Sequence, residues 1–505
     1  MKLYLRGHDY KYAAEQMLLT LFPGQRPLYP AEPPAEGEDF LVLTLTRENG
    51  RAEGEAQLRW QGKTYASRDS IPDPGEPGET EADRAYQQLL KLCFYRCGTA
   101  ALGREPPWGA MTGVRPVKIP TKALLRGESE AEAERRLREI YHVTPQRVRL
   151  AMDCARASVA ARKSLRPDEV SLYVGIPFCP TRCAYCSFIS ADVKRALQLL
   201  EPYLDALERE IAAAGDLLRR SGLFVRTIYF GGGTPTTLSA PQLERVMGAL
   251  EAHLDLSRLT EYTVEAGRPD TITPDKLAVL RAHGAGRVSV NPQSMSDEVL
   301  AAMGRSHTAA DIRRAMADVR AAGFGVVNMD LIAGLPRDSE AGFAASLEEV
   351  LSLVPENITV HTLALKKGSR LMADPEALPS AGAVSAMLDR ADEALRGAGY
   401  VPYYLYRQKY MSGSFENVGW CRPGAENLYN IAMMEELHTV LALGGGGMTK
   451  LVDPDSGRIL RIPNAKYPYE YIQSIEACLA EKEALTAFYA GMKKEGPHGL
   501  SAAGN

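Results

Sequence analysis

The sequence predicts an α/β fold in which a βα unit recurs about six times, with an α+β domain before it and an α+β extension after it. Short apolar runs alternate with amphipathic stretches, which indicates a parallel sheet with helices outside. The pattern changes at Val170, where charged helical sequence gives way to an apolar run. A chain of 505 residues is also too long for one hydrophobic core. We therefore expect an N-terminal α+β accessory domain over 1–165, the βα domain over 166–375, a C-terminal domain over 376–485 and a flexible tail over 486–505.

Composition and charge argue against several classes of protein. The chain carries 59 basic and 63 acidic residues, a formal net charge of −4, which gives no electrostatic attraction to nucleic acid. The beginning, MKLYLRGHDY, has no apolar segment before a small-residue cleavage site, so we expect no secretory signal. No uncharged apolar run reaches the length that spans a bilayer. We therefore expect a cytoplasmic protein without a membrane span.

The front domain combines strand and helix patterns. The stretches FLVLTLTREN (40–49) and EAQLRWQGKTYA (55–66) alternate in polarity and predict two strands of a small sheet. The segment SRDSIPDPGEPGETEAD (67–83) is rich in Pro, Gly and charge, which predicts a loop or linker. From Arg84 to Leu165 the pattern is helical.

In the βα domain, polar or Gly-rich residues follow the predicted strands. The six apolar runs are SLYVGIPF (171–178), RTIYF (226–230), YTVEA (262–266), RVSVNPQS (287–294), VVNMDLIAGLP (326–336) and NITVHTLAL (357–365). In parallel sheets the functional residues lie in loops at the carboxyl ends of the strands. Residues at those ends are Cys179, Gly231 to Thr234, Glu265, Gln293 and Asp330. We expect them to meet at one mouth.

Three of the eight cysteines lie close together in one loop. The spacing Cys179-x3-Cys183-x2-Cys186 supplies three soft thiolates, one fewer than a closed four-ligand site needs. Three ligands on one short loop suit an iron–sulfur cluster that keeps one iron open for a small molecule. A structural zinc site completed by a distant residue is the alternative, although zinc sites usually come as paired Cys or Cys/His halves.

The cysteine loop with Tyr185 before its third cysteine, in YVGIPFCPTRCAYC, resembles the signature of the radical S-adenosylmethionine (SAM) superfamily. Its flanks are similar to the branch that contains oxygen-independent coproporphyrinogen III oxidase. GGGTPT, the strand-end Glu265, NPQ and DLIAGLP extend this resemblance over about Ser171 to Ser369. A narrower resemblance to HemZ-type coproporphyrinogen dehydrogenases rests on WGAMTGVRP, TVEAGRPDTIT, VPYYLYRQK, ENVGW and PGAENLYN.

The resemblance implies a partial (β/α)6 TIM-like radical SAM barrel in which a [4Fe–4S] cluster and SAM are the cofactors. The three loop cysteines would hold three irons, and SAM would chelate the fourth. Tyr173 would contact the SAM carboxylate or the cluster neighbourhood, and no catalytic residue is expected beyond the cluster and SAM. The other implied SAM contacts are Gly232, Gly233 and Thr234 along the methionine part, Glu265, Gln293, Arg305 and Asp330 at the ribose hydroxyls and carboxylate, and the Ala364 backbone at the adenine.

The implied reaction is the oxidative decarboxylation of two propionates of coproporphyrinogen III to vinyl groups, started by a 5′-deoxyadenosyl radical. A low-potential electron donor would be a partner, and residues 376–485 would cover the porphyrinogen. Cations should meet the anionic propionates. Candidates are Arg407 and Lys409, for which a solvated strand face is the alternative, and Arg115 and Lys118, which could instead belong to a packed interface.

Two features leave the function within this family open. Haem chaperones of the family carry an H-N-x-x-Y-W motif, whereas this chain has Asn427 and Asn430 in ENLYNIAM without the histidine–tryptophan pair, and His438 is expected at a helix surface or in a core. Better-known members also carry extra polar or cysteine residues where this chain has Ser187-Phe188 and Met448. Met448 falls at the family's second SAM position, so the number of SAM molecules stays open. A radical SAM methyltransferase or ring-opening enzyme acting on haem is a further alternative.

Overall fold

The computed structural model describes residues 1–32, 34, 37–186, 191–192, 196–364, 378–408 and 415–495. The chain divides into two compact units, Met1–Met152 with Tyr406–Glu416, and Asp153–Leu405 with Asn417–Asn505. The first unit therefore ends before the boundary expected after residue 165, inside helix α5 (Pro145–Ser164), and it takes in a segment from the C-terminal part of the chain. No helix in the described ranges is long and apolar enough to cross a lipid bilayer.

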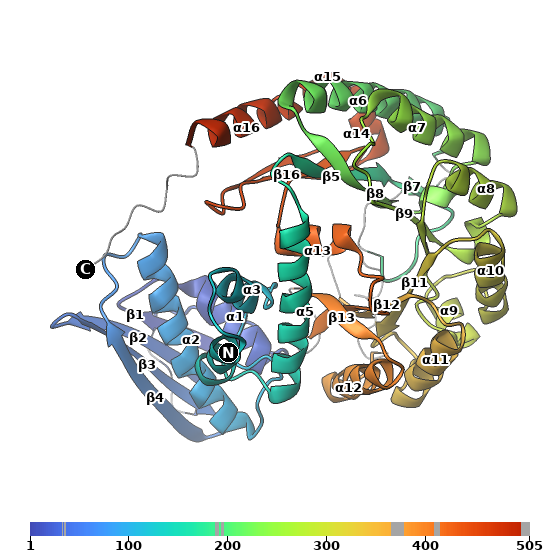
Figure 1. Ribbon diagram of the computed structural model, residues 1–505. Helices are drawn as coiled ribbons and strands as arrows, with labels where there is room; N and C mark the ends of the chain where they lie inside the picture. The colour runs from blue at the N-terminus through green and yellow to red at the C-terminus, as the bar shows by residue number, and fades with distance from the viewer. Residues whose placement is uncertain are drawn as a thin grey trace. The chain divides into compact units, whose positions relative to one another are not determined.

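The first unit is a four-stranded sheet with helices α1 (Lys11–Leu21) and α2 (Thr80–Leu102) on one face (Figure 1). Its strands are β1 (Lys2–Arg6), β2 (Phe40–Glu48), β3 (Arg51–Trp60) and β4 (Lys63–Pro72), with β1 parallel to β2 and the others antiparallel. Short helices α3 (Lys118–Leu125) and α4 (Glu130–Arg135) follow. Leu41, Leu43 and Leu45 alternate along β2 and pack in the core under α2.

The prediction of one strand over 55–66 is wrong, because a hairpin turn divides it. Gln61 and Gly62 both have positive φ, 50° and 78°, which is the backbone of a tight turn between antiparallel strands. The strand after this turn, β4, continues to Pro72. The loop expected over 67–83 is therefore shorter than predicted, because residues 67–72 belong to β4. Its side chains are largely polar and partly exposed, and the hydrophobic pattern of an inner strand is therefore missing.

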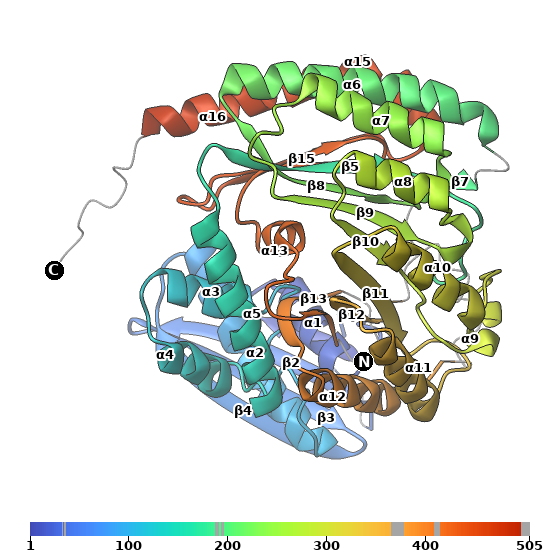
Figure 2. The same ribbon diagram turned by 45° about the vertical axis from the view of Figure 1, so that its right-hand side comes forward.

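The second unit is built on six parallel strands that follow one another across the sheet, which confirms the predicted repeated βα unit (Figures 1 and 2). They are β5 (Glu169–Ile176), β8 (Phe224–Gly232), β9 (Glu261–Gly267), β10 (Arg287–Val290), β11 (Val326–Ala333) and β12 (Asn357–Thr362). The helices between them cover the outer face and are α6 (Leu200–Ser221), α7 (Ala240–His253), α8 (Pro274–Ala282), α9 (Asp297–Ala302), α10 (Ala309–Ala321) and α11 (Glu340–Ser352).

The C-terminal part of the chain extends this sheet at both ends. After α12 (Ala381–Gly397), the strands β13 (Val401–Arg407) and β14 (Glu416–Cys421) lie beside β12, with β14 antiparallel to it. At the other end, β15 (Val440–Leu443) pairs in parallel with β5 and leads into the antiparallel strands β16 (Met448–Val452) and β17 (Ile459–Pro463). Helix α13 (Leu428–Glu435) lies on the side of the sheet opposite α6 and α7.

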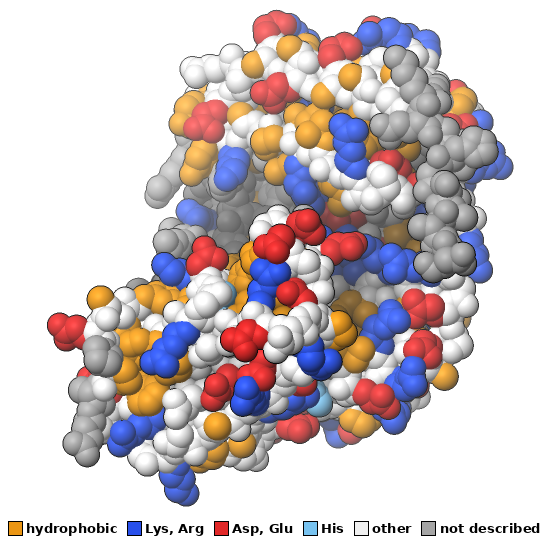
Figure 3. Space-filling view, turned by 90° about the vertical axis from the view of Figure 1, so that its left-hand side faces the viewer, with side chains coloured by type: hydrophobic (Ala, Val, Ile, Leu, Met, Phe, Trp, Pro, Cys, Tyr) orange, Lys and Arg blue, Asp and Glu red, His pale blue; other side chains and the backbone are white. Residues whose placement is uncertain are grey.

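The last helices pack against α6, and they correct the expected tail. α14 (Pro468–Gln473), α15 (Ile475–Lys482) and α16 (Ala484–Glu495) all contact α6. A flexible tail was expected from residue 486, but α16 continues to Glu495 with Leu485, Phe488 and Tyr489 buried. Residues 496–505 lie outside the described ranges. On the face drawn in Figure 3, acidic and basic side chains are interspersed, in keeping with the small net charge.

A buried polar cluster ties the glycine turn after β15 to α6. Glu210 of α6 is fully buried and accepts hydrogen bonds from the Gly444 amide at 2.6 Å and the Tyr471 hydroxyl at 2.5 Å. The Lys482 ammonium lies 2.6 Å from its other oxygen. Burial raises the pKa of Glu210, but the Lys482 charge and the hydrogen bonds outweigh it and leave the pKa below its usual value.

Removing this carboxylate leaves a buried ammonium without its partner. We expect Glu210→Ala to lower the free energy of unfolding by about 3–5 kcal/mol. Arg219→Ala is the control, because its ion pair with Asp216 is exposed on the same helix and should cost no more than about 1 kcal/mol. Urea unfolding of the three proteins measures both values, and equal losses in the two variants would contradict this account of the cluster.

Candidate functional site

The predicted site residues lie at the carboxyl ends of adjacent parallel strands. β5 and β8 pair with Tyr173 opposite Tyr229 and Ile176 opposite Gly232. Next in the sheet, Glu265 lies near the end of β9, and Gln293 follows β10 and bridges to Leu331 of β11. These residues therefore lie on adjacent strands toward one edge of the sheet, which we call the mouth.

The cysteine loop begins directly after β5. Cys183 is buried, whereas Cys179 and Cys186 are half-buried, and none of the three is in a disulfide. The Thr234 hydroxyl lies 3.5 Å from the Cys179 sulfur. Among the described residues, no three His, Cys, Asp or Glu side chains lie close enough together to hold a single metal ion. A [4Fe–4S] cluster binds each cysteine at a different iron and does not require such convergence. Ser187 and Phe188 lie outside the described ranges.

The GGGTPT segment packs tightly against the strand that leads into this loop. Gly232 has a φ of +108°, which side-chain-bearing residues rarely adopt. A Cβ added at Gly233 would lie 2.4 Å from the Phe178 carbonyl oxygen, next to Cys179. A Cβ at Gly231 would lie 3.1 Å from the Tyr173 ring. The absence of side chains here is required by this packing against Phe178 and Tyr173.

Three tyrosines stack beside this glycine segment. Tyr229 of β8 and Tyr429 of α13 have ring centroids 4.4 Å apart, and Tyr173 lies 6.4 Å from Tyr429. The Tyr229 hydroxyl donates a hydrogen bond to Glu265. Sequence reasoning missed Tyr229 and Tyr429. The alternation of β8 predicts that Tyr229 shares a face with Gly231, but nothing in the sequence predicts that Tyr429 reaches this point from a distant helix.

Two carboxyl groups at the mouth have opposite pKa shifts. Burial among the tyrosine rings raises the pKa of Glu265 to about 7, although the hydrogen bond from Tyr229 opposes the change. Burial also raises the pKa of Asp330, but His361 outweighs it and holds the pKa below its usual value, with the Asn328 amide donating to Asp330 at 2.8 Å. The His361 ring lies 3.7 Å from Asp330. Sequence reasoning did not single out His361.

Gln293 presents an acceptor at the mouth. Its φ is +69°, and its backbone is fixed because its amide donates to the Asp330 carbonyl at 2.8 Å. Its own carbonyl accepts from the Ile332 amide at 3.0 Å. The side-chain oxygen is buried and has no hydrogen-bond partner among the described residues. A buried acceptor of this kind is satisfied when a ligand hydroxyl or amine donates to it.

Arg305 lies at the cysteine loop. Its guanidinium is buried and donates to the Asn291 carbonyl and the Tyr185 hydroxyl, both at 2.8 Å. Tyr185 stands between Cys183 and Cys186, so Arg305 contacts the loop that carries the thiols. The SAM contact implied for Arg305 stays a prediction.

The SAM contacts implied for Ala364 and Met448 stay predictions. Ala364 is half-buried just after β12, and Met448 is half-buried at the start of β16.

His438 is a core residue, because it is 5% exposed and its Nε2 lies 2.7 Å from the Ser171 hydroxyl. Burial lowers the pKa of His438 to about 3, so its ring stays neutral.

One predicted substrate cation belongs to the first unit instead. Arg407 is 5% exposed and donates to the Met111 carbonyl at 2.6 Å, with its guanidinium 5.7 Å from the Trp108 ring centroid. Burial lowers its pKa to about 10. The solvated strand face considered for Arg407 is therefore wrong, whereas its propionate contact stays a prediction. Lys409 lies outside the described ranges, and Arg115 and Lys118 stay predictions.

The side chains at the mouth fit a cluster with SAM. Three thiols on one loop suit iron. Carboxylate and amide oxygens accept hydrogen bonds from hydroxyls, and Gln293 offers such an oxygen without a partner among the described residues.

The raised pKa of Glu265 predicts a pH-dependent cost in the ligand-free protein. The unfolded chain releases this proton near pH 4.5, but the folded protein holds it to about pH 7. Stability therefore falls as the pH rises between these values, by about 2 kcal/mol after allowance for the partial exposure of the side chain. We expect Glu265→Gln to match the wild type near pH 4.5 and to exceed its stability at pH 8. Urea unfolding at both pH values measures this, and an equal difference at both would contradict it.

Comparison with known proteins identifies the family. A model of the Radical SAM superfamily matches residues 173–350. The chain is 37% identical over 462 residues to the oxygen-independent coproporphyrinogen-III oxidase-like protein HemZ of Bacillus subtilis (strain 168), covering 90% of this chain and 91% of that relative. It is 29% identical over 307 residues to the heme chaperone HemW of Escherichia coli (strain K12), covering 60% of this chain and 76% of the chaperone.

The fold has a solved counterpart. The structure of coproporphyrinogen III oxidase (HemN) from Escherichia coli, a radical SAM enzyme, is similar with a TM-score of 0.51 at 25% identity, covering 64% of this chain and 72% of that chain. The superfamily match covers the strands that carry the cysteine loop, and the HemZ match extends over nearly all of both chains. This chain therefore belongs to the radical SAM superfamily and, within it, to the HemZ-type branch of the coproporphyrinogen III oxidase family.

Proposed function

We propose that the protein catalyses the oxygen-independent oxidative decarboxylation of two propionates of coproporphyrinogen III, yielding the vinyl groups of protoporphyrinogen IX. The observation that carries this proposal is the mouth itself, where the cysteine loop, the glycine segment, Glu265, Gln293 and Asp330 meet on adjacent strand ends. The similarity to an oxidase-like relative over 91% of that relative's length supports the same reading. A cytoplasmic location and a low-potential electron donor are part of the proposal.

In this proposal Cys179, Cys183 and Cys186 hold three irons of a [4Fe–4S] cluster, and SAM binds beside it. When bound, the two cofactors supply the radical that removes a hydrogen atom from a substrate propionate side chain. The protein orients these groups and keeps water away, which matters because a carbon radical reacts with whatever lies nearest. The buried strand ends and the stacked tyrosines exclude water from their side of the site.

In this proposal three polar side chains of the protein form hydrogen bonds with SAM. Asp330 is held ionised by His361, so its carboxylate accepts from ribose hydroxyls. Glu265 has a pKa of about 7, which leaves it protonated in part at neutral pH unless a donor binds its oxygens. Binding of a cationic amine or a hydroxyl donor there favours its ionised form. The free Gln293 oxygen accepts a further hydrogen bond from the ligand.

A haem chaperone is the second candidate, because the chain is 29% identical to HemW over 307 residues. A chaperone would need an exposed ligand set for haem iron. None of the eight histidines of the sequence is followed by asparagine, as the chaperone motif requires, and His438 is buried in the core. We therefore propose the decarboxylase as the function.

The reaction product separates the candidates. Under anaerobic conditions, reconstituted protein with coproporphyrinogen III, SAM and a strong reductant should release two CO2 for each protoporphyrinogen IX formed. We expect Cys183→Ala to abolish both SAM cleavage and CO2 release, because one iron loses its ligand. Cys154→Ala is the matched control, since Cys154 is a buried free cysteine on α5, and it should keep the activity.

Three outcomes would contradict the proposal. SAM cleavage without decarboxylation would indicate another radical SAM reaction, such as methyl transfer to haem or ring opening. Stoichiometric haem binding without CO2 release would favour the chaperone. Full activity in Cys183→Ala would remove the cysteine loop from the reaction.

A further inference from the structure

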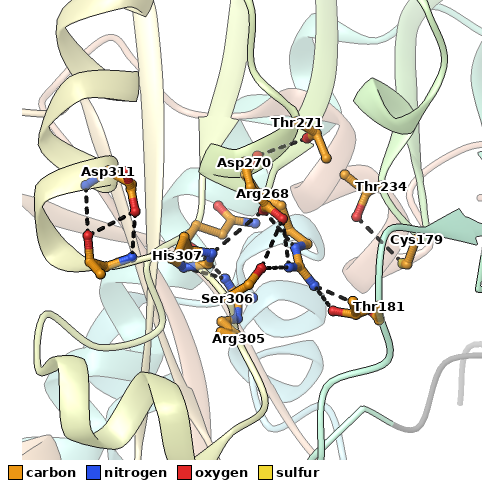
Figure 4. A network of polar contacts seen from close by, with 12 residues as sticks. Cys179, Thr181, Thr234, Arg268, Asp270, Thr271, Arg305, Ser306, His307 and Asp311 are labelled. Carbon is orange, nitrogen blue, oxygen red and sulfur yellow. Dashed lines mark hydrogen bonds and ion pairs between the residues drawn. The ribbon is translucent and has the colours of Figure 1, made fainter.

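A second arginine holds the cysteine loop from the neighbouring strand. Arg268 follows β9, and its side chain is 4% exposed. Its Nη1 donates to the Thr181 hydroxyl at 2.7 Å and to the Thr181 carbonyl at 3.3 Å. Thr181 stands between Cys179 and Cys183 in the loop. The contact with the carbonyl fixes the main chain of the loop as well as a side chain (Figure 4).

The other side of the Arg268 guanidinium is fixed by a carboxylate. Its Nε and Nη2 donate to the two oxygens of Asp270, each at 2.9 Å, and Nη2 also lies 3.3 Å from the Ser306 hydroxyl. This two-pronged pairing orients the planar group and compensates the burial of its charge. The pairing with Asp270 therefore fixes the direction in which Nη1 points, independently of its contact with Thr181.

The same carboxylate connects Arg268 to the arginine at the far end of the loop. The buried His307 ring has one nitrogen 3.7 Å from Asp270 and the other 3.4 Å from the Arg305 guanidinium. Arg305 in turn donates to Tyr185. Between the two arginines, the Ala184 amide donates to the Met303 carbonyl at 3.0 Å. Three contacts therefore hold the loop between its first and last cysteines, at Thr181, Ala184 and Tyr185.

We propose that Arg268 is a positioning residue that holds the cysteine loop, through Thr181, in the conformation that presents its three thiols to one cluster. The inference rests on the proposed cluster. Ordering each loop residue costs conformational entropy, and three cysteines within one short loop must all be placed before the cluster binds. Contacts that order the loop in advance lower this cost, and their loss should accelerate release of the cluster.

The test compares Arg268→Lys and Thr181→Val with the wild type after anaerobic reconstitution. Lysine keeps the charge, but a single ammonium cannot pair with both Asp270 oxygens and also reach Thr181. We expect Arg268→Lys to release iron to a chelator at least about tenfold faster, the factor that corresponds to one lost charge-assisted hydrogen bond. Thr181→Val leaves the Arg268–Asp270 pair and the carbonyl contact intact, and it should change the rate in the same direction by less.

A second readout does not depend on the cluster. In cluster-free protein, hydrogen exchange of the Ala184 amide should be faster in both variants than in the wild type, because the loop opens more often. The matched control is Arg287→Lys. Arg287 is a buried arginine that donates to the Ala425 and Glu426 carbonyls, but it stands at the beginning of β10, away from the strand ends.

The outcomes are distinguishable. Faster cluster release and faster Ala184 exchange in Arg268→Lys, with both unchanged in Arg287→Lys, support the inference. Wild-type rates in both Arg268→Lys and Thr181→Val, or equal acceleration in Arg287→Lys, overturn it. A wild-type protein that takes up no iron–sulfur cluster at all overturns the proposed function first, and the exchange rates in that case still report whether Arg268 orders the loop.

Discussion

The parallel pairing of six strands is the constraint on which the rest of the structure depends. Because the strands run in one direction, everything that follows them collects at one edge of the sheet. The register places Ile176 opposite Gly232, so the start of the cysteine loop and the glycine segment are neighbours. A shift by one residue would exchange the faces of each strand and remove Glu265 and Tyr229 from the mouth. The chemistry proposed here is a consequence of that register.

Burial raises the pKa of each carboxyl group at the mouth, and the neighbouring polar or charged group decides whether the pKa ends above or below its usual value. Burial raises the pKa of Glu265 to about 7, against the effect of the hydrogen bond from Tyr229. Asp330 is enclosed as well, but His361 keeps its pKa low. Buried ion pairs also join Glu210 to Lys482 under the glycine turn and Arg268 to Asp270 beside the cysteine loop. Pairing makes these buried charges tolerable, and it also fixes the position of the backbone segments that they contact.

Much of this architecture follows from the sequence, and the exceptions have physical reasons. The alternation of apolar and amphipathic runs predicts the six βα units, and the spacing of the cysteines predicts their common loop. Contacts between distant segments are different, because no local pattern encodes them: Tyr429 reaches Tyr229 from α13, and Arg268 reaches Thr181 from the end of β9. Burial of Arg407 is equally invisible, since a cation on an alternating strand suggests solvent or substrate, whereas its partner is a carbonyl of the first unit. The residue types in a sequence indicate which interactions the side chains can make, whereas the folded structure decides which partners they meet.

The central claim is that the loop cysteines leave one iron open and that SAM binds to it at this mouth. Electron–nuclear double resonance on the reduced, reconstituted wild-type protein tests this claim most directly, using SAM labelled with 15N in its amino group and 17O in its carboxylate. We predict hyperfine coupling of both labels to the cluster, because both groups would ligate the open iron. A cluster that shows no coupling to either label, in protein that binds SAM, would contradict the account.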